Sequence, residues 1–213
     1  MRRKQVVSEK APVLTAKAKA ILGGAMREFL AHGYAATSMD RVAAAAAVSK
    51  ATVYSHFKNK EGLFDALVRQ LVERRFRPIL HAVLDDAVPD QPAIALRRLA
   101  TNMLDSVSTD RKLQAFMRLV VGESGRFPEL ANAYVSHLVK PVIHALTRYF
   151  KSQPQLKLPH AEAAARIFLG TLVYYVLVQE VLGGKQILPM KREQLIDSLL
   201  SLLLINEPAF RKR

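Results

Sequence analysis

Apolar residues recur every three or four positions through most of the 213-residue chain, which is the period of an amphipathic α-helix. No segment alternates apolar and polar residues as a half-buried strand would. Pro78 and Pro141 lie inside two of the longer helices and should kink them, because proline lacks an N–H and clashes with the preceding turn. The pattern predicts an all-α fold with helices over residues 12–32, 38–46, 49–56, 59–84, 92–107, 109–122, 128–150, 159–182 and 190–205.

Side chains suited to helix capping mark the starts of the short N-terminal helices. Thr37 or Ser38, then Ser49 and Asn59, can each accept a hydrogen bond from an N–H of the following turn. The three helices before residue 57, two of them short, are expected to form a compact trihelical unit.

The charge of the chain is strongly basic and unevenly distributed. Lys and Arg number 32 against 18 Asp and Glu, a net charge of +14 with a pI near 10.2, which points to a polyanion such as nucleic acid or an acidic membrane surface. Residues 1–76 carry 14 basic and 6 acidic groups, whereas residues 77–213 carry 18 and 12. The N-terminal part is therefore expected to bind the polyanion.

Several classes of protein are excluded by composition. The absence of cysteine removes disulfide scaffolds, thiolate metal sites and cysteine nucleophiles. Charged residues follow the basic N-terminus too closely for a signal peptide, and the longest uncharged apolar run, 167–178, is shorter than the roughly 20 residues of a spanning helix. We expect a soluble, cytoplasmic protein without a membrane partner.

The residues between 42 and 57 have the spacing of a helix-turn-helix. Val42, Ala43, Val48, Val53 and Phe57 occupy the positions that two short helices joined by a tight turn would bury. Small and cationic residues begin the second helix, so that its backbone can approach phosphate. The methyl groups of its first turn suit the thymine methyl, which predicts a helix that enters the major groove.

Residues 21–67 closely resemble the N-terminal DNA-binding domain of the TetR family of transcriptional regulators. The matching positions are Phe29, Gly33-Tyr34, Thr37-Ser38, Val42-Ala43, Val48-Ser49-Lys50, Thr52-Val53-Tyr54, His56-Phe57 and Lys60-Glu61. The resemblance implies a basic arm at 1–12, a three-helix DNA-binding domain at 13–66 with its motif at about 38–57, and a larger helical effector-binding and dimerisation domain at 67–213. The DNA-binding candidates are Thr37, Ser38, Lys50, Ala51, Thr52, Tyr54, Ser55, His56 and Lys60.

Alternative roles and departures accompany this resemblance. Tyr54 could instead pack against the first helix, and His56 could simply end its own helix. The family usually has glycine in the turn of the motif, where this chain has Ala47, and a left-handed backbone there would cost alanine roughly 1 kcal/mol. Gly62 stands where the family often has a longer polar residue, which weakens the first turn of the fourth helix.

The run RLVVGESGRFPEL at residues 118–130 resembles the C-terminal domain of an AcrR-like or AefR-like branch of the same family. That resemblance implies a domain that binds an effector and dimerises. Apolar stripes on the predicted helices supply the effector-binding candidates, although Met, aromatic and lone His residues on such stripes are also common in plain cores. The candidates are Met103, Phe116, Met117, Tyr134, His137 and Tyr174.

Two C-terminal helices, at 159–182 and 190–205, are apolar almost all round. A helix of this kind must be buried on both sides, either within one chain or against a second copy. We expect a homodimer, because little protein remains to cover both faces. The interface candidates are Ile167, Leu172, Tyr175, Leu195, Leu199 and Leu203.

These features predict a transcriptional regulator that binds a roughly palindromic double-stranded DNA operator and is released by a small-molecule effector. The alternative is a ligand-independent architectural DNA-binding protein or protein-interaction adaptor, which a solid body core would favour. An enzyme is not expected: no metal-ligand spacing, phosphate-binding loop or cofactor motif is present, and Ser124 lacks the strand-turn-helix context of a hydrolase nucleophile.

Overall fold

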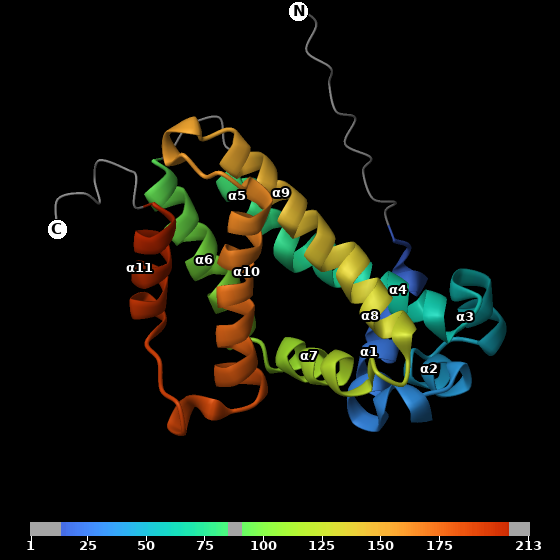
Figure 1. Ribbon diagram of the computed structural model, residues 1–213. Coiled ribbons are helices and arrows are strands. Elements are labelled where there is room, and N and C mark those ends of the chain that lie inside the picture. Colours follow the sequence, from blue (N-terminus) through green and yellow to red (C-terminus); the bar gives the residue numbers. More distant parts are fainter. Residues whose placement is uncertain (1–13, 85–90, 205–213) are drawn as a thin grey trace, which may run out of the picture.

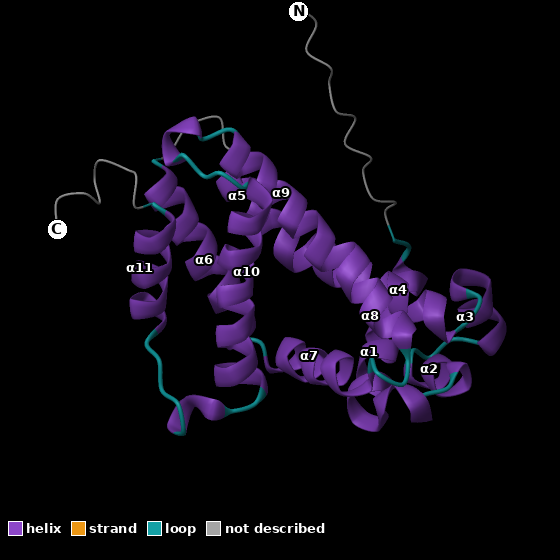
Figure 2. Cartoon of the chain, viewed as in Figure 1, coloured by secondary structure: helices purple, strands orange, loops and turns teal. Residues whose placement is uncertain are grey.

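The computed structural model describes residues 14–84 and 91–204, and these residues form helices, turns and loops without a strand (Figures 1 and 2). The all-α prediction is confirmed. Each predicted helix is present, with ends displaced by four residues or fewer. The expected basic arm at 1–12 lies outside the described residues.

The N-terminal helices form a head, defined here as α1 (Ala16–Ala36), α2 (Met39–Ala45), α3 (Lys50–Phe57) and α4 (Lys60–Leu71). Capping side chains fix their starts: Thr15, Ser38, Ser49 and Asn59 each accept a hydrogen bond from a first-turn N–H, over 2.8–3.2 Å. The first helix thus begins at Ala16, directly after its cap Thr15 and four residues later than expected.

The remaining helices form the body. They are η1 (Val72–Phe76), α5 (Arg77–Leu84), α6 (Pro92–Ser108), α7 (Arg111–Glu123), α8 (Pro128–Tyr134), η2 (Val135–Val139), α9 (Lys140–Lys151), η3 (Pro154–Leu156), α10 (Ala161–Val176), η4 (Leu177–Val181), η5 (Gly184–Gln186) and α11 (Arg192–Leu203). In Figure 1, α4–α5 and α8–α9 run side by side from the head into the body, and α7 crosses from the α6–α10 region to the head.

The two long helices are irregular one turn before each proline. η1 precedes Pro78 and η2 precedes Pro141, and both are single π-helical turns. A proline removes one backbone donor and crowds the carbonyl four residues earlier, and a wider turn relieves that clash. The irregularity therefore lies before the proline and not at it.

Buried apolar side chains form two clusters. One fills the body, and the other joins α1–α4 but also contains Phe116 and Val120 of α7 and Leu130 and Ala133 of α8. The head therefore packs on the body through a shared apolar core.

One helix of the described residues, Ala161–Val181, is long and apolar enough to cross a membrane by length and composition alone. Of its most apolar window, 39% is buried within the chain, and two of the helix's charged residues, Glu162 and Arg166, pair with each other at 2.7 Å. Core helices of soluble proteins share this composition.

Candidate DNA interface and body cavity

The helix-turn-helix has the geometry expected from its apolar spacing. Val42, Ala43, Val53 and Phe57 are buried and Val48 is half-buried, so α2 and α3 pack through these side chains. The opposite face of α3 is open to solvent.

The turn between α2 and α3 places Ala47 in the left-handed region, with φ +52°. The N–H of Val48 donates to the carbonyl of Ala43, and the N–H of Ala47 donates to that of Ala44, both over 3.1 Å. This is the Schellman pattern of helix termination, which favours glycine at the left-handed position. Alanine therefore carries the strain that the sequence suggested, and the turn keeps its geometry.

Gly62 has a steric role in the first turn of α4. A Cβ at this position would lie 2.7 Å from the carbonyl oxygen of Phe57 and 3.1 Å from Oδ1 of Asn59. The same Oδ1 accepts the N–H of Gly62 over 2.8 Å. A longer residue would displace this cap.

The open face of α3 carries six of the DNA-binding candidates. Lys50, Ala51, Tyr54, Ser55 and His56 are exposed, Tyr54 by 42%, and Thr52 is half-buried. Tyr54 and His56 are exposed, so both side chains are accessible to DNA. Ser38, at the start of α2, is exposed as well.

The polar groups of this face have partners within the chain. The ammonium of Lys50 lies 2.8 Å from the carboxylate of Asp40 on α2, which raises the pKa of Lys50, and 5.9 Å from the ring centroid of Tyr54. The hydroxyl of Thr52 lies 2.8 Å from that of Ser49, and the hydroxyl of Ser55 donates to the carbonyl of Thr52. DNA would therefore exchange these contacts for its own.

Two further candidates point into the head. Thr37 is 2% exposed, and its hydroxyl donates to the carbonyl of Gly33 over 2.7 Å. The ammonium of Lys60 donates to the carbonyls of Tyr34, Thr37 and Ala35 over 2.8, 3.1 and 3.4 Å, and lies 4.4 Å from the Tyr34 ring centroid. In this structure both side chains stabilise the chain between α1 and α2.

The body contains a cavity of ≈ 70 Å³ between α4, η1, α6, α7, α8, η2, α9 and α10. All its lining side chains are apolar except for the phenol of Tyr134, whose pKa is raised by burial. Four of the six effector-binding candidates contribute to the lining: Met103, Phe116, Met117 and Tyr134.

The other two candidates lie elsewhere. His137 points away from the cavity and pairs through Nε2 with Asp65 of α4. Tyr174 is 60% exposed on α10. His137 lies one turn after Ala133, which packs on the head, and so faces α4, whereas Tyr174 lies on the uncovered side of α10.

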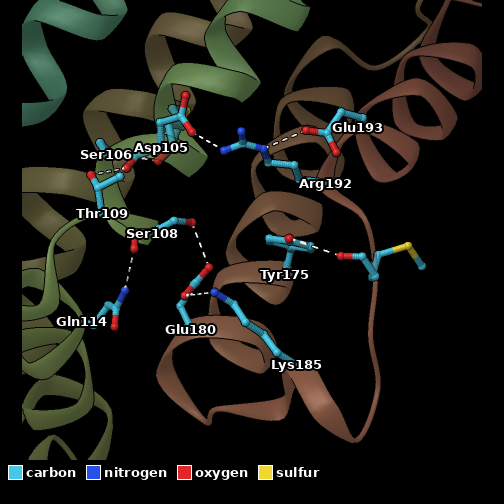
Figure 3. A network of polar contacts seen from close by, with 12 residues as sticks. Asp105, Ser106, Ser108, Thr109, Gln114, Tyr175, Glu180, Lys185, Arg192 and Glu193 are labelled. Carbon is cyan, nitrogen blue, oxygen red and sulfur yellow. Dashed lines mark hydrogen bonds and ion pairs between the residues drawn. The ribbon is translucent and has the colours of Figure 1, made fainter.

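A polar network joins the ends of α6, α10 and α11 (Figure 3). The carboxylate of Glu180, 8% exposed as a residue, accepts from Ser108 over 2.9 Å and pairs with Lys185 at 2.8 Å. Arg192 pairs with Asp105 and with Glu193, and Tyr175 donates to the carbonyl of Met190 over 3.3 Å. The apolar pattern of the chain does not predict this network, although Gln179 and Glu180 at the end of a long apolar helix are a signal for it.

One face of α10 and α11 stays uncovered. Of the six interface candidates, Leu172, Tyr175, Leu199 and Leu203 are buried within the chain, Leu195 is half-buried, and only Ile167 is exposed, by 56%. Other large apolar side chains accompany it on the open face: Val173 (41% exposed), Tyr174 (60%) and Leu202 (75%).

Family models match both parts of the chain. Residues 21–67 match the bacterial regulatory proteins of the tetR family, and residues 94–205 match the C-terminal domain of AefR-like transcriptional repressors. The second match spans more than half of the chain. The protein belongs to the TetR family.

Individual members of the TetR family show the extent of the likeness. The chain is 32% identical to a solved structure described as the flavonoid-responsive regulator FrrA, with a TM-score of 0.70 over 89% of this chain and 95% of that one. It is 29% identical over 135 residues to the regulator YhgD of Bacillus subtilis, and 30% identical over 100 residues to AcrR of Shigella flexneri. The alignment with YhgD covers 63% of this chain and 65% of YhgD, and the alignment with AcrR covers 47% of this chain and 46% of AcrR. The chain thus matches less than two thirds of either relative.

The TetR assignment fixes the class of function. Its members are DNA-binding transcriptional regulators of the repressor class and not enzymes. Among the described residues, no group of three His, Asp or Glu side chains is placed to hold a metal ion.

Proposed function

We propose that this TetR-family protein is a homodimeric cytoplasmic repressor that binds a roughly palindromic operator and is released from it by a small apolar effector. The observation that carries the proposal is the combination of an open α3, flanked by Lys50 and Lys58, with an apolar cavity in the body on which the head packs. A ligand-independent architectural protein or adaptor would have a solid body.

DNA recognition is assigned to α3. Lys50, Ala51, Thr52 and Ser55 would face the groove, while Ser38, Tyr54 and His56 would bind mainly phosphate. Thr37 and Lys60 would act indirectly, since their polar groups stabilise the chain between α1 and α2. The DNA-binding unit would comprise residues 13–66 and the effector-binding and dimerisation unit residues 67–213, joined by the shared core.

The dimer would form through the open face of α10 and α11. Ile167, Val173, Tyr174 and Leu202 expose apolar surface of the kind that marks a protein interface. Gly170, whose added Cβ would meet no atom within 4 Å, would allow two copies of α10 to approach closely. A two-fold dimer presents its two α3 helices symmetrically, which explains why we expect a palindromic operator.

The effector is assigned to the cavity by its lining. A dry, apolar cavity binds apolar molecules, and flexible methionines let it expand around a ligand larger than its present volume. The buried phenol of Tyr134 offers one polar contact. The flavonoid-responsive relative FrrA supports an uncharged aromatic effector.

A two-step experiment tests this function. DNA bound by the full-length protein is selected from a random pool, and the recovered duplex is then challenged with uncharged aromatic compounds such as the flavonoid naringenin. We expect a defined operator and at least one compound that weakens binding about tenfold, which requires about 1.4 kcal/mol of coupling. Enrichment of an operator that no apolar compound affects would favour the architectural alternative.

A further inference from the structure

The last residues of α1 and Thr37, here called segment 33–37, lead into α2 and are held by side chains from two different helices. α1 is interrupted at Gly33, where φ is +77°, so the N–H groups that follow lack helical partners. The carboxylate of Glu123, the last residue of α7, accepts from the N–H of Tyr34 over 2.9 Å and from that of Ala35 over 3.3 Å.

The fit between Glu123 and this segment is close. A Cβ at Gly33 would lie 2.7 Å from Oε1 of Glu123, so a side chain there would force the carboxylate to shift. On the other side, the ammonium of Lys60 on α4 binds the carbonyls of the same segment. A carboxylate therefore holds the N–H groups and an ammonium holds the carbonyls, immediately before Ser38.

The position of Glu123 opposes ordinary helix electrostatics. A carboxylate in the last turn of a helix faces the negative end of the helix dipole, which is unfavourable. Residues that break a local preference are concentrated at functional sites. The contact with the head accounts for this residue at the end of α7.

α7 is also bound to η4, which continues α10, through its middle, and to α6 through its first half. Arg118 donates to the carbonyls of Val181 and Glu180 at the end of η4, over 2.6 and 2.9 Å. Gln114 donates to the carbonyls of Val107 and Ser108 on α6, over 3.0 and 3.3 Å, the latter contact being drawn in Figure 3.

A wall residue of the cavity links α7 to the head as well. Phe116 lines the cavity and stacks on Phe64 of α4 with centroids 5.4 Å apart, and Phe64 contacts Tyr34 at 5.6 Å. Displacement of α7 at the cavity would therefore reach the segment held by Glu123 through both apolar and polar contacts.

We propose that Glu123 is a positioning residue for DNA binding, through which α7 couples the cavity to the segment that begins α2. The coupling part of this inference rests on the proposed function of an effector-released repressor. When Glu123 holds the N–H groups of Tyr34 and Ala35, Ser38 and α2 keep the orientation that DNA binding needs. Movement of α7 by a ligand would loosen that orientation.

The test compares operator affinities of full-length variants without any effector, on the duplex selected with the parent protein. Glu123→Gln and Glu123→Ala should weaken operator binding about tenfold, the effect of one hydrogen bond to a charged group. The matched control is Glu61→Gln, which removes the same charge from an exposed position of the head. If only the lost negative charge mattered, all three variants would bind the operator as tightly as the parent protein or more tightly, because DNA is itself negatively charged.

Melting and sedimentation must show that each compared variant is folded and has the parent's oligomeric state. Should Glu123→Ala not fold, the isosteric Glu123→Gln decides. Operator binding by folded Glu123→Gln at the level of Glu61→Gln would overturn the positioning role.

A double-mutant cycle with Phe116→Leu tests the coupling through α7. Both residues would act through the position of α7. The fold-loss in operator affinity of the double variant should therefore be clearly smaller than the product of the fold-losses of the two single variants. Additivity within about twofold would overturn the coupling. Neither measurement uses an effector, so both results can be interpreted even if no compound releases the protein from DNA. If no operator is selected at all, the proposed function itself is contradicted.

Discussion

At the scale of single residues, contacts between positions far apart in the sequence change the roles that pattern alone suggests. Ser38, Ser49 and Asn59 could be predicted as caps because their partners lie three residues away. Lys60 and Glu123 could not be assigned their partners, which lie more than twenty and more than eighty residues away. Only the tertiary fold brings those groups together.

Replacing Ala47 with glycine should stabilise the protein by about 0.5–1 kcal/mol, because glycine adopts a positive φ without a steric penalty. Urea unfolding monitored by circular dichroism measures the change. Ala44→Gly, at an exposed position inside α2, is the matched control and should destabilise by about the same amount. A destabilised Ala47→Gly variant would show that the turn is not left-handed.

Removing the ammonium of Lys60 in Lys60→Met should lower the free energy of unfolding by about 1–2 kcal/mol, since the bonded carbonyls of segment 33–37 lose a charged donor. Lys58→Met, two residues earlier at an exposed position between α3 and α4, should leave stability within about 0.5 kcal/mol of the parent. Equal stability of the two variants would contradict the structural role of Lys60.

At the scale of helices, the 3.6-residue period predicts where a helix lies and how long it is. It does not predict which side of an apolar helix is buried within the chain. Leu172 and Leu199 share helices with Ile167 and Leu202, yet the first pair is buried in the chain and the second is exposed. All four are apolar, so the sequence predicted two strongly apolar helices but not which of their side chains stay exposed. His137 likewise faces Asp65 of α4 and not the cavity.

Changes on the two faces of α10 should therefore have different consequences. Ile167→Glu and Tyr174→Glu should yield folded monomers by sedimentation, because charge on an exposed apolar face opposes association. Leu172→Glu, on the buried face of the same helix, should instead prevent folding. Dimers that persist in both exposed-face variants would place the interface elsewhere.

At the scale of the whole molecule, the head and the body pack on each other through one apolar cluster. The apolar cluster of the head includes side chains of α7 and α8, and the cavity lies where α4, α7 and the π-helical turns η1 and η2 meet. A charge division between N-terminal and C-terminal parts could be predicted from sequence, but this shared core could not, since it depends on which helices contact one another.

The measurement that tests the central claim most directly is a footprint of the full-length protein on its selected DNA. Two copies of the chain related by a two-fold axis should protect two inverted half-sites, whose centres are separated by one helical turn, roughly 34 Å, or by a small multiple of it. Lys50→Ala or Thr52→Ala should alter the base preference within both half-sites, since α3 would present both side chains to the groove. A single asymmetric half-site, or a sequence preference unaffected by every substitution on the open face of α3, would contradict the account.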